Sequence, residues 1–584
     1  VTTIEKDLGN SYPDQRGIQY LRYGGTANVH IELKSDVVVE NHPMSEDGRK
    51  KARKNIEKDL RAENIIIRDE SFAWVREHDI GAIAKSRKDR KLLSEGIPCS
   101  WRVIDDMSKS GSNDQSVNEA TGSHGSLALA QGKKIAEVCR HSHETITKSG
   151  RDTTKIVSLK LDIASAYRNF KITASDWWLF GFMFDGKRYL HTSWPFGAVA
   201  SVYNFLRIPL MIVYYVAVIS WWWDAGVVAA MYFDDLSILG HQDDIEKAGT
   251  EMLELFDRWS IPRQQEKWEE ENKNGLKGSP KMTIMGLQYS FPDMTVGVPP
   301  DRLRDILEEV QSFMTTATSK AQSFKKWESI IGVMSWCTIA IAQLRPLLTG
   351  TWHFKRIWTN QHNMKGFRKM GKELKEDWEY FMKYAKQWSG TSAIFHKHKI
   401  RVNKEGYDGK RIDPAADAAG TSGWGVVSEY GHAKGRWAEK EKDLPIHIKE
   451  GLALFMLISL FGKKLQCTEL TILLRSDNQG LVKSLKRGRA KDRKLNVIVQ
   501  LITGELLKHD MVLRCWKTRK KIVTDVEYIG TKENVLADAL SRFDMKTFNE
   551  ITNKLPFNAQ QEVPIPSGTM RRWTEAVEKI TKIT

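Results

Sequence analysis

The chain has 584 residues, of which 89 are Lys or Arg and 73 are Asp or Glu, so its formal net charge is +16. This length accommodates roughly three to five domains of ordinary size, and the basic surplus favours a polyanionic partner, nucleic acid before membrane. The five cysteines form no Cys-x-x-Cys pair, which argues against a disulfide framework and a zinc site. Because the first residues lack the apolar segment of a signal peptide, we expect an intracellular protein, in the cytoplasm, the nucleus or both.

Residues 1–75 are rich in charge, and a basic cluster at 49–54 lies inside an expected helix. Their apolar content is too thin for a large core. We predict a basic N-terminal extension that contacts nucleic acid, with a solvated helix face as the alternative. The segment 108–125, rich in Gly, Ser, Asn and Asp, predicts a loop.

Three acids stand in apolar surroundings in the centre of the chain. An apolar run predicts a strand that ends in Asp162, and residues 231–239 predict a β-hairpin whose tip carries Asp234 and Asp235. Adjacent carboxylates resist joint ionisation unless a cation lies between them, and Mg²⁺ prefers carboxylate oxygens. If the strand lies beside the hairpin, the acids converge on a pair of metal ions, an arrangement suited to in-line phosphoryl transfer.

An uncharged apolar run at 208–223 lies between these acidic motifs. It is shorter than the roughly 20 apolar residues that a bilayer requires. We therefore predict a buried helix and no transmembrane segment or membrane partner.

The Asp162 segment and the sequence Tyr232-Phe233-Asp234-Asp235 resemble motifs A and C of reverse transcriptases, the second being the Tyr-x-Asp-Asp box. The resemblance implies a right-hand polymerase, with fingers and palm at 76–297 and thumb and connection helices at 298–400. It also implies that Asp162, Asp234 and Asp235 hold two Mg²⁺ ions, with Mn²⁺ as the alternative ion.

Further segments extend this resemblance. A Trp-Arg pair resembles the fingers strand that brings an arginine to the incoming triphosphate, and an aromatic five residues after Asp162 stands where the family excludes a 2′-hydroxyl. A Pro-Phe-Gly turn resembles motif B, which supports the template base and the nucleotide. The substrate-binding residues implied in this way are Arg102, Tyr167, Phe196, Gly197 and Tyr232.

The sub-family stays open. In motif B, Trp194 replaces the usual leucine and no proline follows the turn. The sequence from Ser201 to Arg207 is similar to retrotransposons of the DIRS type, whereas Arg345-Pro346-Leu347 resembles a signature of long-terminal-repeat elements such as the Gypsy type. The periodic apolar residues that follow Pro299 and Pro300 predict a helix in the expected thumb.

A second set of acids begins beyond residue 400. Asp417 leads into a glycine-rich hairpin, Glu450 opens an apolar helix at 451–460, Asp477 closes a buried strand and Asp538 begins a helix. Four acids at such positions predict a second two-metal site. Asp413 is the rival first ligand, but the Gly-Trp-Gly spacing favours Asp417.

The order and context of these acids resemble ribonuclease H, above all in the sequence Ala-Asp-Ala-Leu-Ser-Arg at 537–542. The resemblance implies an RNase H-like α/β domain at 401–545, with two Mg²⁺ ions, that cuts the RNA strand of RNA·DNA hybrids. We predict that His509, the histidine between Asp477 and Asp538, is structural. No chemistry is assigned to the tail at 546–584.

The sequence thus predicts an α+β multidomain protein, a retroelement reverse transcriptase with a C-terminal ribonuclease H. The expected partners are an RNA template, a DNA primer, the RNA·DNA hybrid and dNTPs, together with other retroelement products such as a recombinase or integrase and a capsid. Two alternatives stay open: a host-adopted or degenerate scaffold that only binds nucleic acid, and an active ribonuclease H with a structural polymerase remnant.

Overall fold

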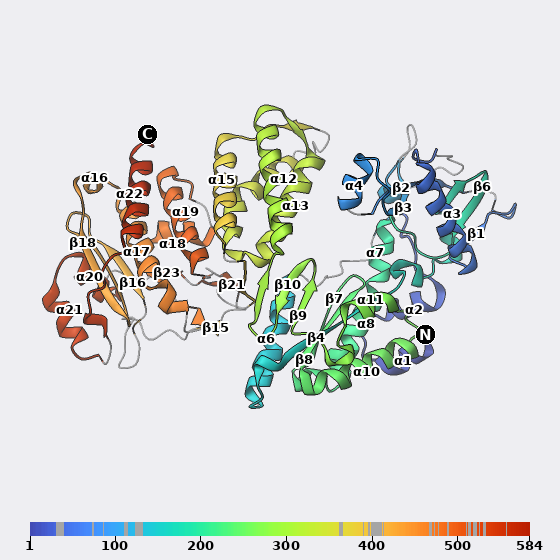
Figure 1. Ribbon diagram of the computed structural model, residues 1–584, viewed down its shortest axis with the longest axis horizontal. Coiled ribbons are helices and arrows are strands. Elements are labelled where there is room, and N and C mark those ends of the chain that lie inside the picture. The colour runs from blue at the N-terminus through green and yellow to red at the C-terminus, as the bar shows by residue number, and fades with distance from the viewer. Residues whose placement is uncertain are drawn as a thin grey trace. The chain divides into compact units, whose positions relative to one another are not determined.

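The computed structural model mixes helices and strands throughout the part of the chain that it describes (Figure 1). The chain divides into two compact units, residues 1–285 with 291–293 and residues 286–290 with 294–584. The finer division at 75, 297, 400 and 545 stays a prediction. The described residues are 1–583 without 31–39, 73–74, 86, 110–114, 123–131, 361–365, 389, 395–396, 399–411, 413, 467–469, 472–473, 477, 488–489, 510, 512–514, 518–521, 525, 529–532 and 556–557.

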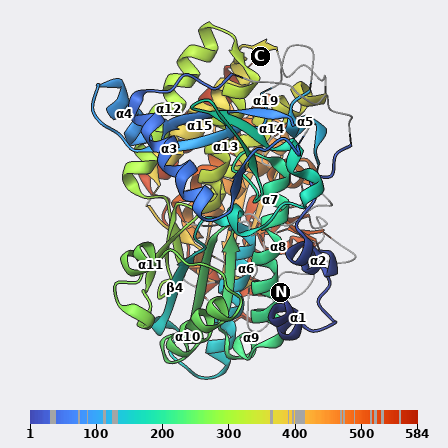
Figure 2. The ribbon, with the colours of Figure 1, turned by 90° about the vertical axis from the view of Figure 1, so that its right-hand side faces the viewer.

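A three-stranded antiparallel sheet forms the centre of the first unit. Its order is β4 (Ile156–Asp162), β8 (Asp235–His241) and β7 (Val228–Tyr232), with β8 in the middle. The helices α6 (Gly132–Lys148) and α10 (Gln242–Arg258) lie along this sheet (Figure 2). The structure confirms the predicted hairpin at 231–239 and the predicted strand that ends in Asp162, and it places the two side by side.

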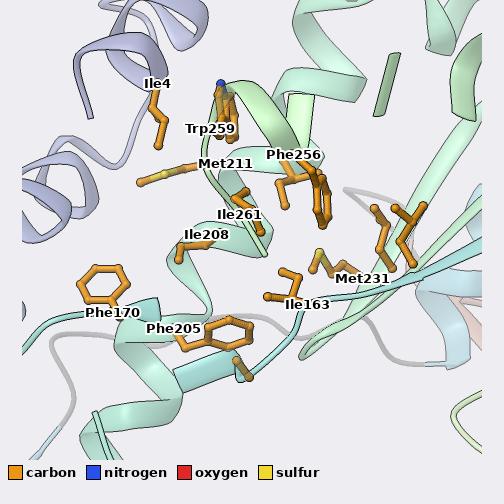
Figure 3. Close-up of a cluster of buried hydrophobic side chains, with 14 of the residues drawn as sticks. Ile4, Ile163, Phe170, Phe205, Ile208, Met211, Met231, Phe256, Trp259 and Ile261 are labelled. Atoms are coloured by element: carbon orange, nitrogen blue, oxygen red, sulfur yellow. The ribbon is translucent and has the colours of Figure 1, made fainter. Parts of the chain in front are cut away.

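The N-terminal residues pack into the core of this unit, although their apolar content was expected to be too thin. The short helix α1 (Thr2–Leu8) buries Ile4 and Leu8, and Figure 3 shows Ile4 close to Met211 and Trp259. Asp14, which caps α2 (Gln15–Tyr23), also pairs with the buried Arg207. A few apolar residues are enough to anchor this segment because they join a core that is formed mainly by later segments.

A second sheet in the first unit has the order β1 (Ile65–Ile67), β6 (Lys187–His191), β5 (Gly181–Phe184), β2 (Glu77–Ala84) and β3 (Trp101–Asp106). The helix α3 (Glu46–Arg61) packs against β2 and β3 through Ala52 and Ile56. Its basic residues at 49–51 and 53–54 are exposed. The basic cluster therefore lies on a solvated helix face, and its contact with nucleic acid stays a prediction.

A helical segment covers the apolar run predicted at 208–223 and the residues just before it. It comprises α7 (Val199–Phe205), α8 (Arg207–Tyr214) and the π-helix η4 (Tyr215–Ile219), followed by α9 (Trp222–Ala225). Among the described residues, Val199–Ile219 is the one helix whose length and composition would let it cross a membrane. Half of the residues in its most apolar stretch are buried inside the protein.

The second unit begins its helical part with α12 (Pro300–Ser319), which starts where the proline pair and the apolar period predict. It continues through α13 (Phe324–Ala340), the 3₁₀ helix η6 (Ala342–Leu348), α14 (Thr349–Asn360) and α15 (Lys372–Gln387). Edge-to-face contacts join Trp327 to Phe313 and Trp378 in the interior of this group.

A five-stranded mixed sheet follows in the second unit. Its order is β18 (Gly431–Arg436), β17 (Gly423–Ser428), β16 (Ala415–Ala418), β20 (Leu474–Ser476) and β23 (Val526–Tyr528). The first three strands are antiparallel, whereas β20 runs parallel to both β16 and β23. The helices that accompany the sheet are α17 (Ile446–Gln466), α18 (Gln479–Arg487), α19 (Arg493–Lys508) and α20 (Val535–Ser541).

The tail to which the sequence assigned no chemistry is part of this fold. It forms α21 (Met545–Thr552) and α22 (Ser567–Thr581). Trp573 of α22 is buried against Trp424 and Trp437. Since Trp573 belongs to the same apolar cluster as the central helix α17, α22 helps to close the core.

Candidate active sites

Strand register brings the first three acids together. Asp162, the last residue of β4, lies opposite Asp235, the first residue of β8. Asp234 lies in the hairpin turn, where its carbonyl oxygen accepts a hydrogen bond of 2.9 Å from Ile163 N. The preceding Phe233 has a φ of 55°, a left-handed conformation that keeps the turn tight. The three carboxylates therefore stand on adjoining backbone segments.

A lysine enters this acid cluster from the same sheet. Lys160 Nζ lies 3.2 Å from Asp235 Oδ2, and the Lys160 side chain is only 8% exposed. Asp162 is also buried, at 7% exposure. One ammonium offsets part of the charge of three carboxylates, and the remaining negative charge on hard oxygen donors suits Mg²⁺.

Two aromatic residues of the predicted substrate site meet beside these acids. Tyr167, on the 3₁₀ helix η2 (Ala166–Asn169), has its ring centre 5.0 Å from that of Phe196 and 5.4 Å from that of Phe205. Burial, and then the charge of Asp234, raise the pKa of the Tyr167 hydroxyl. Phe196 is 44% exposed, so it offers a ring face at the surface beside Tyr167.

Gly197 lies in a turn that only glycine fits. Its φ is 113°, and a Cβ added there would lie 1.9 Å from the carbonyl oxygen of Asp105. Asn118 holds the turn from the other side, because Nδ2 donates to Gly197 O at 2.8 Å and Oδ1 accepts from Val199 N at 2.8 Å. The sequence did not single out Asn118, which lies in the segment predicted as a loop; only its residue type, suited to capping turns, was a signal.

The two remaining substrate-site candidates lie on strands, one in each sheet of the first unit. Tyr232 ends β7 opposite Asp235 and contacts Phe233 edge-to-face, with ring centres 4.8 Å apart. Arg102 lies on β3 of the second sheet, opposite Ile83, and is exposed to solvent. Arg102 is thus available to an anion, and its contact with a triphosphate stays a prediction.

Behind the Gly197 turn is a buried polar network that the sequence did not reveal. Arg168 Nη1 donates to His191 Nδ1 at 2.8 Å, and Arg168 Nη2 pairs with Asp59 at 3.1 Å. Asp105 Oδ1 lies 3.5 Å from His191 Nε2 and 3.3 Å from His78 Nε2. Burial, and then the charge of Arg168, lower the pKa of His191 to about 3, so this imidazole is neutral.

The spacing within this network would suit a metal ion, since one ligand atom from each of His78, Asp105 and His191 lies within 4.8 Å of the others. A guanidinium only donates hydrogen bonds, so His191 Nδ1 must accept and the proton of the neutral ring lies on Nε2. Protonated Nε2 cannot bind a metal. The cluster is therefore a hydrogen-bonded support under the Asp105 carbonyl that faces Gly197.

The second set of acids is assembled from a strand and two helices. Asp417, on β16, is 3% exposed and accepts a hydrogen bond of 2.6 Å from Ser541 Oγ and one of 3.3 Å from Asn534 Nδ2. Glu450, on α17, is 4% exposed, and its Oε1 accepts from Ala418 N at 3.2 Å. Since Ala418 follows Asp417 in the strand, the structure brings these two carboxylates together.

Asp538 lies on α20, one turn before Ser541. Ser541 Oγ contacts both the Asp538 carbonyl, at 2.9 Å, and the Asp417 carboxylate. The Asp538 carboxylate is partly exposed and accepts a hydrogen bond of 2.8 Å from Arg542 Nε. Asp477 lies outside the described residues, as does Asp413, the rival of Asp417 for the first ligand position. The three described acids supply hard oxygen donors, which fit a divalent cation such as Mg²⁺.

His509, predicted to be structural, ends α19 and is 8% exposed. Its Nε2 lies 3.6 Å from Glu505 Oε2, and its ring fills the space beside Gly462 on α17. Burial, followed by the charges of Lys508 and Lys463, lowers its pKa to about 4. Within the described residues, the environment of His509 is that of a packed side chain, and its assignment as a structural residue stays a prediction.

Comparison with known proteins gave only distant similarities. No family model and no curated protein matches the chain. Among solved structures, it is similar to the foamy viral protease-reverse transcriptase dRH in complex with double-stranded DNA, at 11% identity and a TM-score of 0.39 over 86% of this chain and 79% of that chain. It is also similar to the same viral protein with an RNA/DNA hybrid, at 12% identity and a TM-score of 0.38 over 91% and 62% of the two chains.

Proposed function

We propose that this chain is a retroelement RNA-directed DNA polymerase with a C-terminal ribonuclease H. The observation that carries the proposal is the register of β4 and β8, which sets Asp162 opposite Asp235 beside the hairpin turn of Asp234. Three carboxylates so close on one sheet suit two Mg²⁺ ions, which would stabilise the attacking and leaving oxygens of a phosphoryl transfer.

The surrounding residues support nucleotide binding at this site. Tyr167 and Phe196 form an aromatic contact next to the acids, where a sugar and a base could pack against rings. The Gly197 turn, held by Asn118, allows close approach of a nucleotide to the backbone. Lys160 holds the Asp235 carboxylate in place, and Arg102 is the proposed partner of the triphosphate.

The second part of the proposal assigns RNA-strand cleavage to Asp417, Glu450, Asp477 and Asp538. The mixed sheet, in which the first three strands are antiparallel and the next two parallel, packs against the apolar α17. This α/β arrangement supports the predicted RNase H-like domain. Ser541 and Asn534 orient the Asp417 carboxylate. The bound Mg²⁺ would supply an activated water and stabilise the leaving oxygen.

Primer extension and hybrid cleavage test the two sites separately. With an RNA template, a DNA primer, dNTPs and Mg²⁺, we expect Asp234→Asn to lose extension by at least ~100-fold while hybrid cleavage persists. Asp417→Asn should have the opposite effect. Asp224→Asn, a change at an exposed acid on α9, is the matched control and should alter neither activity.

The outcomes also separate the alternatives. Cleavage without extension in the unmodified chain would favour an active nuclease with a structural polymerase remnant. Hybrid binding without either activity would favour a nucleic-acid-binding scaffold. The sub-family, DIRS type or Gypsy type, stays open under all three outcomes.

A further inference from the structure

A pocket of about 520 Å³ opens between three helices of the second unit, away from the acid residues described above. It lies between α15, α19 and α22, so the C-terminal helix completes its wall. Tyr384 sits deep in the pocket because α19 carries a glycine there: a Cβ on Gly504 would lie 2.5 Å from the Tyr384 ring. The Tyr384 hydroxyl donates to Gln500 O at 3.0 Å, which fixes the ring against α19.

The lining of this pocket is strongly basic. Five cations face two carboxylates, which leaves an excess of three positive charges: Lys383, Lys508, Arg571, Arg572 and Lys579 against Glu505 and Glu575. Such an excess in a concave, partly apolar site concentrates positive potential and favours an anionic ligand.

The two carboxylates engage cations of α19 and α22. Glu505 is 1% exposed and pairs with Arg572, and Lys508 Nζ lies 3.9 Å from its Oε2. Glu575 lies 3.9 Å from Arg571 in an exposed pair. Such a pair contributes little to stability. Two cations of the pocket, Lys383 and Lys579, have no carboxylate within 4.0 Å among the described residues.

Aromatic rings lie next to these two lysines. Lys579 Nζ donates to the Tyr380 hydroxyl at 2.5 Å, and Lys383 Nζ lies 6.0 Å from the centre of the Tyr384 ring. Lys383 is exposed, whereas Tyr380 and Lys579 are half-buried. The pocket thus combines ammonium groups at its rim with rings and the apolar side chains of Val497 and Leu501 along its wall.

We propose that this pocket binds one phosphate-bearing nucleotide unit of a single-stranded nucleic acid. Lys383 and Lys579 would hold the phosphate, and the base would pack on the tyrosine side, as bases stack on aromatic residues in single-strand-binding proteins. Free nucleotides offer the same chemistry, so the test separates the two sources. The inference does not depend on the proposed catalysis, because none of these residues belongs to either acid site.

The test measures binding by the full chain of a fluorescently labelled ten-residue oligonucleotide and, separately, of adenosine monophosphate. The variant Lys383→Glu/Lys579→Glu is compared with Lys440→Glu/Lys554→Glu, which makes the same charge change at exposed lysines of the second unit outside the pocket. We expect the pocket variant to weaken oligonucleotide binding at least ~10-fold and to lower the salt slope by about 0.7, as for the loss of one neutralised phosphate on a single strand. The control should stay within about twofold.

Circular dichroism and thermal melting establish that both variants are folded, and Lys383→Gln/Lys579→Gln, a milder change, should show a smaller loss in the same direction. Weakened binding of adenosine monophosphate alone would assign the pocket to free nucleotides and overturn the single-strand assignment. Equal loss in the control and pocket variants, or no loss in either, would overturn the pocket as a site. Primer extension on a short duplex is measured in parallel, so failure of the proposed catalysis is seen independently.

Discussion

The two acid sites are built in different ways. In the first, the three acids lie on the paired strands β4 and β8 and on the turn that begins β8, and a buried lysine of the same sheet offsets part of their charge. In the second, the described acids come from a strand and two helices, and neutral donors, Ser541 Oγ, Asn534 Nδ2 and Ala418 N, orient the carboxylates. The first site depends on strand register and a charge; the second depends on helix packing and hydrogen bonds.

This difference implies that the two sites respond to different perturbations. The first site combines strand register with a buried charge pair, so both a clash that displaces the neighbouring turn and the loss of the lysine should have large effects. Neutral hydrogen bonds contribute about 0.5–1.5 kcal/mol each. Loss of any one of them should therefore reduce the activity of the second site only in part.

The largest expected effect is that of Gly197→Val. The new side chain would clash with the Asp105 carbonyl at a φ of 113°. We expect extension to fall by about 100-fold or more, in line with about 3 kcal/mol of overpacking and backbone strain. Hybrid cleavage should not change, because this turn lies in the first unit. Val199→Ala in the same segment is the control; equal losses in both variants would contradict the clash.

Removal of the cation from the first site comes next. Lys160→Met keeps the apolar stem but leaves Asp235 without its ammonium partner, and breaking such a buried pair costs about 3 kcal/mol. We expect a lower melting temperature in EDTA that Mg²⁺ largely restores, because the ion replaces the lost charge. The exposed Lys155→Met serves as the comparison. A melting temperature that Mg²⁺ does not raise would show that no cation binds between the acids.

The buried network of the first unit should make its stability depend on pH. The pKa of folded His191, about 3, is below its ordinary value, so the folded unit binds fewer protons than the unfolded chain between about pH 6.5 and pH 3. Stability therefore falls as the pH decreases through this range, by about 2 kcal/mol at pH 5 from this group.

The side chain of the variant His191→Gln cannot titrate. Its free energy of unfolding in urea should therefore differ less between pH 7.5 and pH 5 than that of the unmodified chain, although the variant is less stable at pH 7.5. His141→Gln, which changes a histidine outside the network, should leave the difference unchanged. An unaltered pH dependence in His191→Gln would refute the neutral state of this imidazole.

The smallest expected effect is in the second site. Ser541→Ala removes the hydroxyl that donates to Asp417 Oδ2 at 2.6 Å, and loss of such an orienting partner lowers activity by about 10-fold. We expect slower hybrid cleavage with unchanged extension, and Ser541→Thr, which keeps a hydroxyl, should retain more activity than Ser541→Ala. If Ser541→Ala leaves the rate of hybrid cleavage unchanged, helix packing alone orients Asp417.

Some of this architecture could be predicted because its signal is local. The alternation of apolar residues around Asp162, Asp234 and Asp235 predicted a strand and a hairpin, and the apolar period after Pro300 predicted a helix. The long helix α17 around Glu450 was predicted for the same reason. In each case neighbouring residues share one periodic pattern.

Other features depend on residues far apart in the chain. The Arg168 network joins side chains from α3, β2, β3, η2 and β6, and Asn118 reaches a turn about 80 positions away. The packing of α1 against the core and of α22 against α17 and α19 depends on surfaces that other segments build. No local pattern of a single segment contains this information.

The sequence by itself determined the secondary structure that carries the acids, because hydrophobic period and turn residues act over a few positions. Only the tertiary structure decided which acids are neighbours, which neutral donors and which lysine hold them, and that the C-terminal helix completes a basic pocket. The physical reason is that charges and hydrogen-bond donors act through space, and their partners are set by the packing of the whole unit.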